Sequence, residues 1–188
     1  MSVRTILNRH HLLAGVTLLL AAAATPALAA PAPATARTEH ASVQLRADRA
    51  VVAPGESLWL AVTLTSIPHW HTYWKNPGDT GLPTRISWTL PEGVHAGPIE
   101  WPLPHRLPTP PLMSFGYEGA ADLLVRLDVP AGVQGSLPLR AKVNWLVCAE
   151  QCVPESAELG LDLPVGRSTP APDAQALAAI AARLPRPA

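Results

Sequence analysis

The feature that most constrains the fold is a series of short runs in which every second residue is apolar. In the clearest run, Ser57 to Thr65, one face carries Leu58, Leu60, Val62 and Leu64. The opposite face carries Trp59, Ala61, Thr63 and Thr65. Successive side chains of a β-strand point to opposite faces, so this spacing predicts a strand with one face in a hydrophobic core.

Similar runs occur along most of the chain and are separated by turn residues. They are Ala41 to Leu45, Arg85 to Leu90, Gly119 to Val129, Ser136 to Val147 and Ser156 to Val165. Stretches such as Pro54-Gly55-Glu56 and Pro91-Glu92-Gly93 are typical turns. The chain has 22 prolines and one helix-like segment, Asp173 to Leu184, for which Asp173 is the predicted N-cap. This pattern predicts an all-β sandwich of about seven to nine strands with a short C-terminal helix.

The first 29 residues have the features of a secretory signal peptide. Arg4 and Arg9 give a basic start, Leu12 to Ala24 is an apolar stretch of 13 residues, and Ala27-Leu28-Ala29 is a small-x-small cleavage site. The alternative is an uncleaved membrane anchor, but 13 apolar residues are too few to span a bilayer. We therefore expect residues 1–29 to be a signal peptide.

Charge and composition exclude two other classes of protein. Removal of Arg4 and Arg9 with the signal leaves 12 basic and 14 acidic residues without a basic stripe, so nucleic acid is not an expected partner. No later apolar run approaches 18 residues, which predicts a soluble mature protein. The expected organisation is a flexible linker at 30–39, one domain at 40–166, and a second linker with the short helix at 167–188.

The only two cysteines, Cys148 and Cys152, are separated by three residues and follow the apolar run that ends at Val147. In a straight strand, residues four positions apart lie about 13 Å from each other, whereas a disulfide needs Cα atoms within about 7 Å. If the cysteines are bonded, the chain must therefore turn between them. The polar pair Glu150-Gln151 and the following Pro154 suit such a turn.

Three interpretations of this pair remain open on the residues alone. A structural disulfide across so short a loop would contribute little, on the order of 2 kcal/mol. A redox-active dithiol would use the short spacing to let one thiol resolve a mixed disulfide formed by the other. A metal site would combine the two thiolates with histidine.

Two further segments are rich in aromatic residues. The first, His69 to Gly81, begins His-Trp-His-Thr-Tyr-Trp, which places His69, His71 and Tyr73 on one face if it is a strand. It is either a site wall or a set of core tryptophans with solvated histidines, and a His-x-His copper or zinc pair is a third alternative. The second segment holds Phe115 between prolines and glycines, where we expect a loop. That ring is either a lid or contact surface, or a loop aromatic packed back on the sandwich.

Together these three segments resemble the N-terminal periplasmic domain of the DsbD family of thiol:disulfide interchange proteins, most closely its copper-tolerance branch. The matching stretches are His-Trp-His-Thr-Tyr-Trp-Lys-Asn-Pro-Gly-Asp from 69, Ser-Phe-Gly-Tyr-Glu-Gly from 114, and Trp-Leu-Val-Cys-Ala-Glu-Gln-Cys-Val-Pro-Glu from 145. The similarity covers roughly residues 40 to 165. It implies an immunoglobulin-like sandwich located in the periplasm.

The resemblance also implies site residues and partners. Cys148 and Cys152 would be the catalytic pair, with Cys152 as the interchange sulfur. Phe115 would lie on a cap loop, and Tyr117, His71 and Tyr73 would complete the cap and flank the pair. The domain would accept electrons from a thioredoxin-like donor and reduce periplasmic disulfide-containing proteins, without a cofactor or metal.

The resemblance leaves two points open about the chain. Family members usually continue into a membrane electron-transfer domain and a thioredoxin-like domain, so this chain is expected to be either a stand-alone homologue or a fragment. The alternative function is a non-catalytic β-sandwich that binds copper or a protein, with Cys148–Cys152 as a structural disulfide.

Overall fold

The computed structural model describes residues 32–185 and contains thirteen strands and one helix in that range. The predicted signal peptide, residues 1–29, lies outside the described residues. The strands are β1 Thr35–Arg37, β2 Ala41–Ala47, β3 Arg49–Val51, β4 Ser57–Ser66, β5 His71–Gly78, β6 Arg85–Thr89, β7 His95–Glu100, β8 His105–Thr109, β9 Leu112–Glu118, β10 Ala120–Asp128, β11 Ser136–Cys148, β12 Cys152–Pro164 and β13 Thr169–Pro170. The helix, α1, is Ala174–Ala181. It is not long and apolar enough to cross a membrane.

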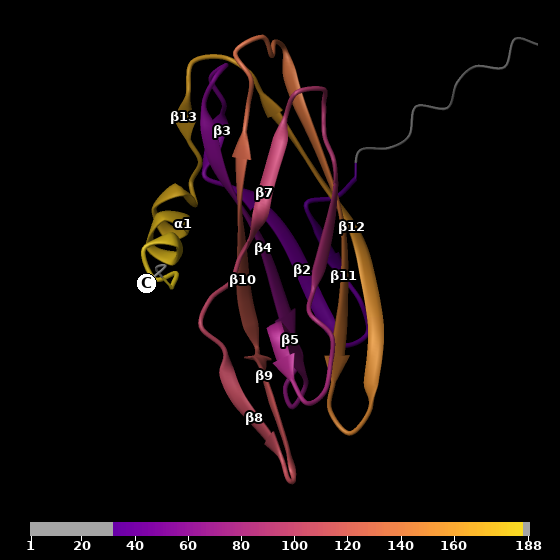
Figure 1. The fold of residues 1–188 in the computed structure, drawn as a ribbon. Coiled ribbons are helices and arrows are strands. Elements are labelled where there is room, and N and C mark those ends of the chain that lie inside the picture. Colours follow the sequence, from indigo (N-terminus) through magenta and orange to yellow (C-terminus); the bar gives the residue numbers. More distant parts are fainter. Residues whose placement is uncertain (1–31, 186–188) are drawn as a thin grey trace, which may run out of the picture. The chain divides into compact units, whose positions relative to one another are not determined.

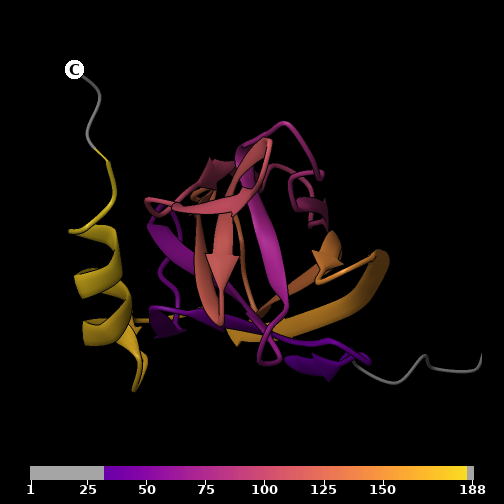
Figure 2. The same ribbon diagram turned by 90° about the horizontal axis from the view of Figure 1, so that it is seen from below.

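Two antiparallel sheets pack against each other to form the sandwich (Figures 1 and 2). The first has the strand order β1-β2-β4-β10-β7, and the second has the order β12-β11-β5-β9-β8, with β6 paired to β11. The prediction of an all-β sandwich with a short C-terminal helix is confirmed. The strand count exceeds the expected seven to nine because the short strands β1, β3, β7, β8 and β13 lack a clear alternating apolar pattern.

The core lies between the inner faces of the two sheets. Leu58, Leu60, Val62 and Leu64 of β4 are all 0–1% exposed, as their spacing predicts. The outer face of the same strand is covered by α1, whose Leu177 packs on Ala61 and on Leu124 of β10. The helix is therefore held by an apolar patch on the sheet rather than by its own propensity, since eight residues are too few for a stable isolated helix.

The structure bears on two expectations for the ends of the domain. Residues 35–37, assigned to a flexible linker, form β1, because Ala36 pairs with Val43 and the strand adds to the edge of β2. Asp173 is the N-cap residue of α1, as predicted, but its side chain makes no capping hydrogen bond. Its carboxylate instead lies 3.7 Å from the guanidinium of Arg46.

Strand β11 changes its neighbour just before the cysteines. Its pairing with β6 reaches Asn144 opposite Arg85, and its pairing with β5 consists of Cys148 opposite His71. The segment between β5 and β6, residues 79–84, therefore connects two strands that lie on the same side of β11. Its first five residues, referred to below as the 79–83 loop, lie close to the two cysteines.

Candidate active site

The two cysteines close a tight β-hairpin. Cys148 is the last residue of β11, Cys152 is the first of β12, and they are partners in the ladder. Their sulfurs are bonded and their Cα atoms lie 4.1 Å apart. The predicted turn is therefore present: Ala149 to Gln151 form the loop, and the amide of Ala149 donates to the carbonyl of Gln151.

The two halves of the disulfide differ in their access to solvent. Cys148 is 1% exposed, whereas Cys152 is exposed at the tip of the hairpin. Disulfide exchange requires a thiolate to reach one sulfur of the bond. A protein partner can therefore approach the Cys152 side of the bond, while Cys148 is shielded by the protein.

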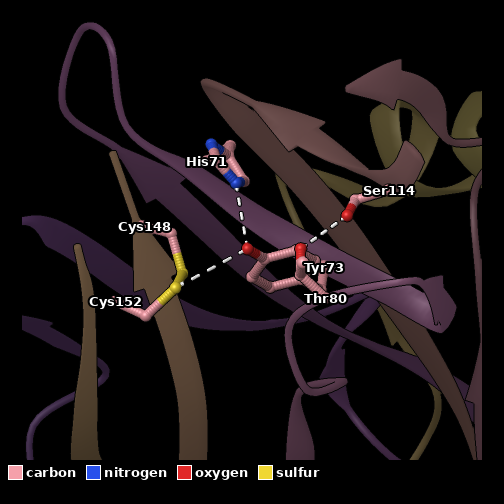
Figure 3. Close-up of a disulfide and its surroundings, with 6 residues drawn as sticks. All are labelled: His71, Tyr73, Thr80, Ser114, Cys148 and Cys152. Carbon is pink, nitrogen blue, oxygen red and sulfur yellow. Dashed lines mark hydrogen bonds between the residues drawn. A yellow bond between two sulfur atoms is a disulfide. The ribbon is translucent and has the colours of Figure 1, made fainter. Parts of the chain in front are cut away.

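Tyr73 and His71 form a wall beside the disulfide (Figure 3). The Tyr73 hydroxyl lies 3.8 Å from Cys152 Sγ and 3.1 Å from His71 Nε2. A disulfide sulfur carries no hydrogen, so the tyrosine hydroxyl is the donor to sulfur, and His71 Nε2–H then donates to the tyrosine oxygen. The arrangement is a short chain of donors that ends at the exposed sulfur. Of the interpretations for this segment, the site wall is the one that the geometry favours.

The charge state of His71 follows from its partly buried position. Burial lowers the pKa of His71 below 6.5, and the nearby Glu118 carboxylate opposes this by raising it. Glu118 is the β9 partner of His71 in the ladder. The imidazole is therefore neutral at pH 7 and acts as a hydrogen-bonding group rather than as a fixed cation beside the sulfurs.

The 79–83 loop covers the ring of Tyr73, which is only 2% exposed. Gly81 has φ +86°, and a β-carbon at this position would collide with the tyrosine ring. The loop is tied to β9 by a hydrogen bond between Thr80 Oγ1 and Ser114 Oγ (2.6 Å) and by Asp79, whose carboxylate accepts from the amide of Met113. Gly81 ends the aromatic-rich segment that begins at His69, and no separate role was predicted for it, although a glycine next to an aromatic-rich strand is a signal of close approach.

The structure corrects the expected positions of Phe115 and Tyr117. Phe115 lies within β9 rather than in a loop, because β9 pairs with both β5 and β8. Its ring passes close to Gly78, where a β-carbon would be 3.3 Å from Phe115 Cδ2. Tyr117 is paired with Thr72, so it points to the opposite face from Tyr73 and donates to the carbonyl of Pro102 at 2.8 Å. Tyr117 therefore does not flank the disulfide.

The described residues also bear on the two metal-site interpretations, the cysteine pair with histidine and the His-x-His pair. His69 is exposed in the turn before β5 with φ 69°, so it does not continue the face of His71. Within residues 32–185 no cluster of three or more histidine, cysteine or acidic side chains could hold a metal ion.

Burial raises the pKa of Glu155, but hydrogen bonds from Thr38 and His40 outweigh it and hold the pKa below its usual value. That carboxylate therefore braces β12 against the β1–β2 turn.

Fold and site together define a class of protein: a β-sandwich domain with a disulfide hairpin in which one cysteine is buried and the other is exposed. Residues 41–164 match the family described as thiol:disulfide interchange protein DsbD, N-terminal, so the chain belongs to this family. The resemblance inferred from the three motifs is thereby confirmed. A search of curated proteins found no significant match.

A solved structure supports the fold. The N-terminal periplasmic domain of ScsB from Proteus mirabilis superposes with a TM-score of 0.61 at 21% identity, covering 80% of this chain and 57% of that one. This chain thus spans somewhat more than half of the ScsB structure. The GAE domain of yeast GGA1 and that of GGA2p from Saccharomyces cerevisiae each give a TM-score of 0.36 at 12% identity. Each match covers 67% of this chain, and the matches cover 94% of the GGA1 domain and 93% of the GGA2p domain.

Proposed function

We propose that this chain exchanges disulfides with partner proteins through Cys148 and Cys152. The observation that carries the proposal is the unequal burial of the two cysteines, with the Tyr73 hydroxyl next to the exposed one. Membership of the DsbD family supports the same chemistry. The electron donor is a thioredoxin-like protein or domain, and the acceptors are disulfide-containing proteins of the periplasm.

The proposed exchange has two halves, each of which moves two electrons. A donor thiolate attacks Cys152 Sγ, the Cys148–Cys152 bond breaks, and Cys148 leaves as a thiolate that takes a proton. The second thiol of the donor then attacks the mixed disulfide and releases Cys152, so the donor is oxidised and the pair is reduced. In the second half, the Cys152 thiolate attacks an acceptor disulfide, and Cys148 then attacks Cys152 Sγ to restore the bond and release the reduced acceptor.

The wall beside the pair has two roles in this proposal. The Tyr73 hydroxyl, oriented by His71, donates to the Cys152 thiolate when the bond is open. The Tyr73 ring and the 79–83 loop limit the approach of small oxidants to the reduced pair. Phe115 remains a proposed cap residue, acting through its ring next to Gly78, the residue just before that loop.

We also propose that the protein is located in the periplasm and that the signal peptide is cleaved near Ala29. The mass of the exported protein would test this cleavage.

A redox titration tests whether the pair is exchange-active. We expect the chain, equilibrated in thiol–disulfide buffers, to be half-reduced at a potential above about −300 mV, below which structural disulfides typically lie. Because the chain has only two cysteines, alkylation of the reduced form reports the pair directly. A pair that stays oxidised below that potential would instead support the alternative function, a binding domain with a structural disulfide.

The Tyr73 hydroxyl can be tested separately with Tyr73→Phe. A hydrogen bond to a charged group contributes about 1.5–3 kcal/mol, so losing the donor should slow the attack of the reduced pair on a disulfide at pH 7 by about tenfold. The difference should disappear at high pH, where the thiol is ionised in either protein. Tyr117→Phe is the matched control, because that hydroxyl binds Pro102 on the other face of the sheet. Equal rates for wild type and Tyr73→Phe would remove the hydroxyl from the mechanism.

A further inference from the structure

A groove of about 280 Å³ lies on the sheet close to the exposed cysteine. One wall is the 79–83 loop with Leu82 and Pro83, and the other side is formed by Leu146 of β11 and Pro154 of β12. Arg85, at the start of β6, lies at the same groove. The groove is located where β11 leaves β6 and has not yet paired with β5.

The register of the hairpin places this groove on the same face as the disulfide. Leu146 lies two residues before Cys148 and is paired with Pro154, which lies two residues after Cys152. Alternate residues of a strand share a face, so these two side chains continue the surface that carries the sulfurs. At about 3.3 Å per residue the groove begins roughly 7 Å along the strand from the cysteines.

This distance determines what must occupy the groove during exchange. In a mixed disulfide the two Cα atoms lie within about 7 Å, so the backbone of the partner is held next to Cys152. Two to four residues of extended chain beyond its cysteine, at about 3.3 Å each, reach as far as the groove. A partner that approaches the exposed sulfur along β12 therefore lays a segment of its own chain there.

The chemistry of the groove indicates which segment fits. Leu82 is 62% exposed and, with Leu146 and Pro154, offers apolar contact. Arg85 is exposed, and the ion pairs found within residues 32–185 do not include it, so its charge is available to a carboxylate. The Glu155 carboxylate is already bound by Thr38 and His40. Pro154 has no amide hydrogen, which disfavours addition of the partner as a further strand on the edge of β12.

We propose that this groove binds the extended segment of the partner protein that flanks its reactive cysteine, with an apolar residue against Leu82 and an acidic residue near Arg85. This inference rests on the proposed function and adds a specificity to it. The groove selects among partners, whereas the disulfide performs the exchange.

The test compares peptide and small disulfides as oxidants of the reduced chain. The peptide probe has one cysteine, blocked as a mixed disulfide with a small thiol, and carries leucine and glutamate two to four residues away. Hydroxyethyl disulfide is the small probe. Leu82→Ser should slow the reaction with the peptide about tenfold relative to the reaction with the small probe. Leu103→Ser is the matched control, because Leu103 is 68% exposed and lies away from this groove.

A charge swap makes the test independent of the leucine. Arg85→Glu should slow the glutamate peptide and accelerate a version in which lysine replaces the glutamate. Equal rates for both peptides with wild type and variants, while exchange itself proceeds, would overturn the groove and leave the proposed function intact. A wild-type chain that reacts with neither the peptide nor hydroxyethyl disulfide would overturn both.

Discussion

Cys148→Ala should accumulate a mixed disulfide with a thioredoxin-like partner whose single cysteine is supplied as a disulfide with a small thiol, and Cys152→Ala should not. The Cys152 thiolate attacks the partner's sulfur, and the small thiol leaves in its reduced form. The reason is access: Cys152 is exposed at the hairpin tip, next to the Tyr73 hydroxyl, whereas Cys148 is only 1% exposed. The variant that keeps Cys152 retains the reachable sulfur and loses the thiol that resolves the adduct. The expected difference is close to all-or-none and is measured by non-reducing electrophoresis and mass.

Two other results of the trapping experiment would contradict this expectation. An adduct from Cys152→Ala alone would exchange the roles of the two sulfurs, and would imply that Cys148 becomes exposed when the partner binds. No adduct from either variant would favour the structural disulfide. The double variant is the control for adducts that do not involve this pair, since the chain has no other cysteine.

Gly81→Ala should lower the free energy of unfolding by about 2–5 kcal/mol, well beyond the effect of Gly119→Ala. Both glycines have positive φ, +86° and +71°, so an alanine at either costs about 1–2 kcal/mol in backbone strain. Only at Gly81 would the new β-carbon also collide with the Tyr73 ring, whereas Gly119 has open space around it. Overpacking of this kind costs about 1–3 kcal/mol more. Denaturant unfolding of the two variants measures the difference.

The same pair of variants tests the shield over the disulfide. If Tyr73 is displaced in Gly81→Ala, small thiols should reduce the disulfide several-fold faster than in Gly119→Ala. Gly81→Ala and Gly119→Ala with equal stability and equal reduction rates would mean that the loop does not press on Tyr73.

Phe115→Ala removes the ring beside Gly78 and should speed oxidation of the reduced pair by small oxidants, with folding nearly intact. Unchanged oxidation in Phe115→Ala would remove that residue from the cap.

Several properties of this protein could be predicted from the sequence because they depend on near neighbours along the chain. The alternation in Ser57 to Thr65 requires one buried face whatever the partner strand, and Leu58 to Leu64 are buried as predicted. The turn between Cys148 and Cys152 follows from chain geometry once they are bonded, and the hairpin has it. The three motifs likewise identified the family, since they are contiguous stretches of residues.

The composition of the site depended instead on the register between distant strands. Tyr73 reaches Cys152 because His71 pairs with Cys148, a pairing of β5 with β11 that no local pattern specifies. A shift of one residue reverses the face of every side chain, and Tyr117 points away from the disulfide because it pairs with Thr72 rather than with Tyr73.

The sequence by itself therefore determined the strands with alternating apolar residues, the hairpin and the cysteine pair, all of which are set by interactions within a few residues. Only the tertiary structure decided which cysteine is exposed, which aromatic ring touches it, and that Gly81 lies against that ring. The physical reason is that burial and contact between strands are properties of two packed sheets. They arise when segments far apart in the chain pair or pack together. The same local pattern is compatible with more than one strand pairing and register.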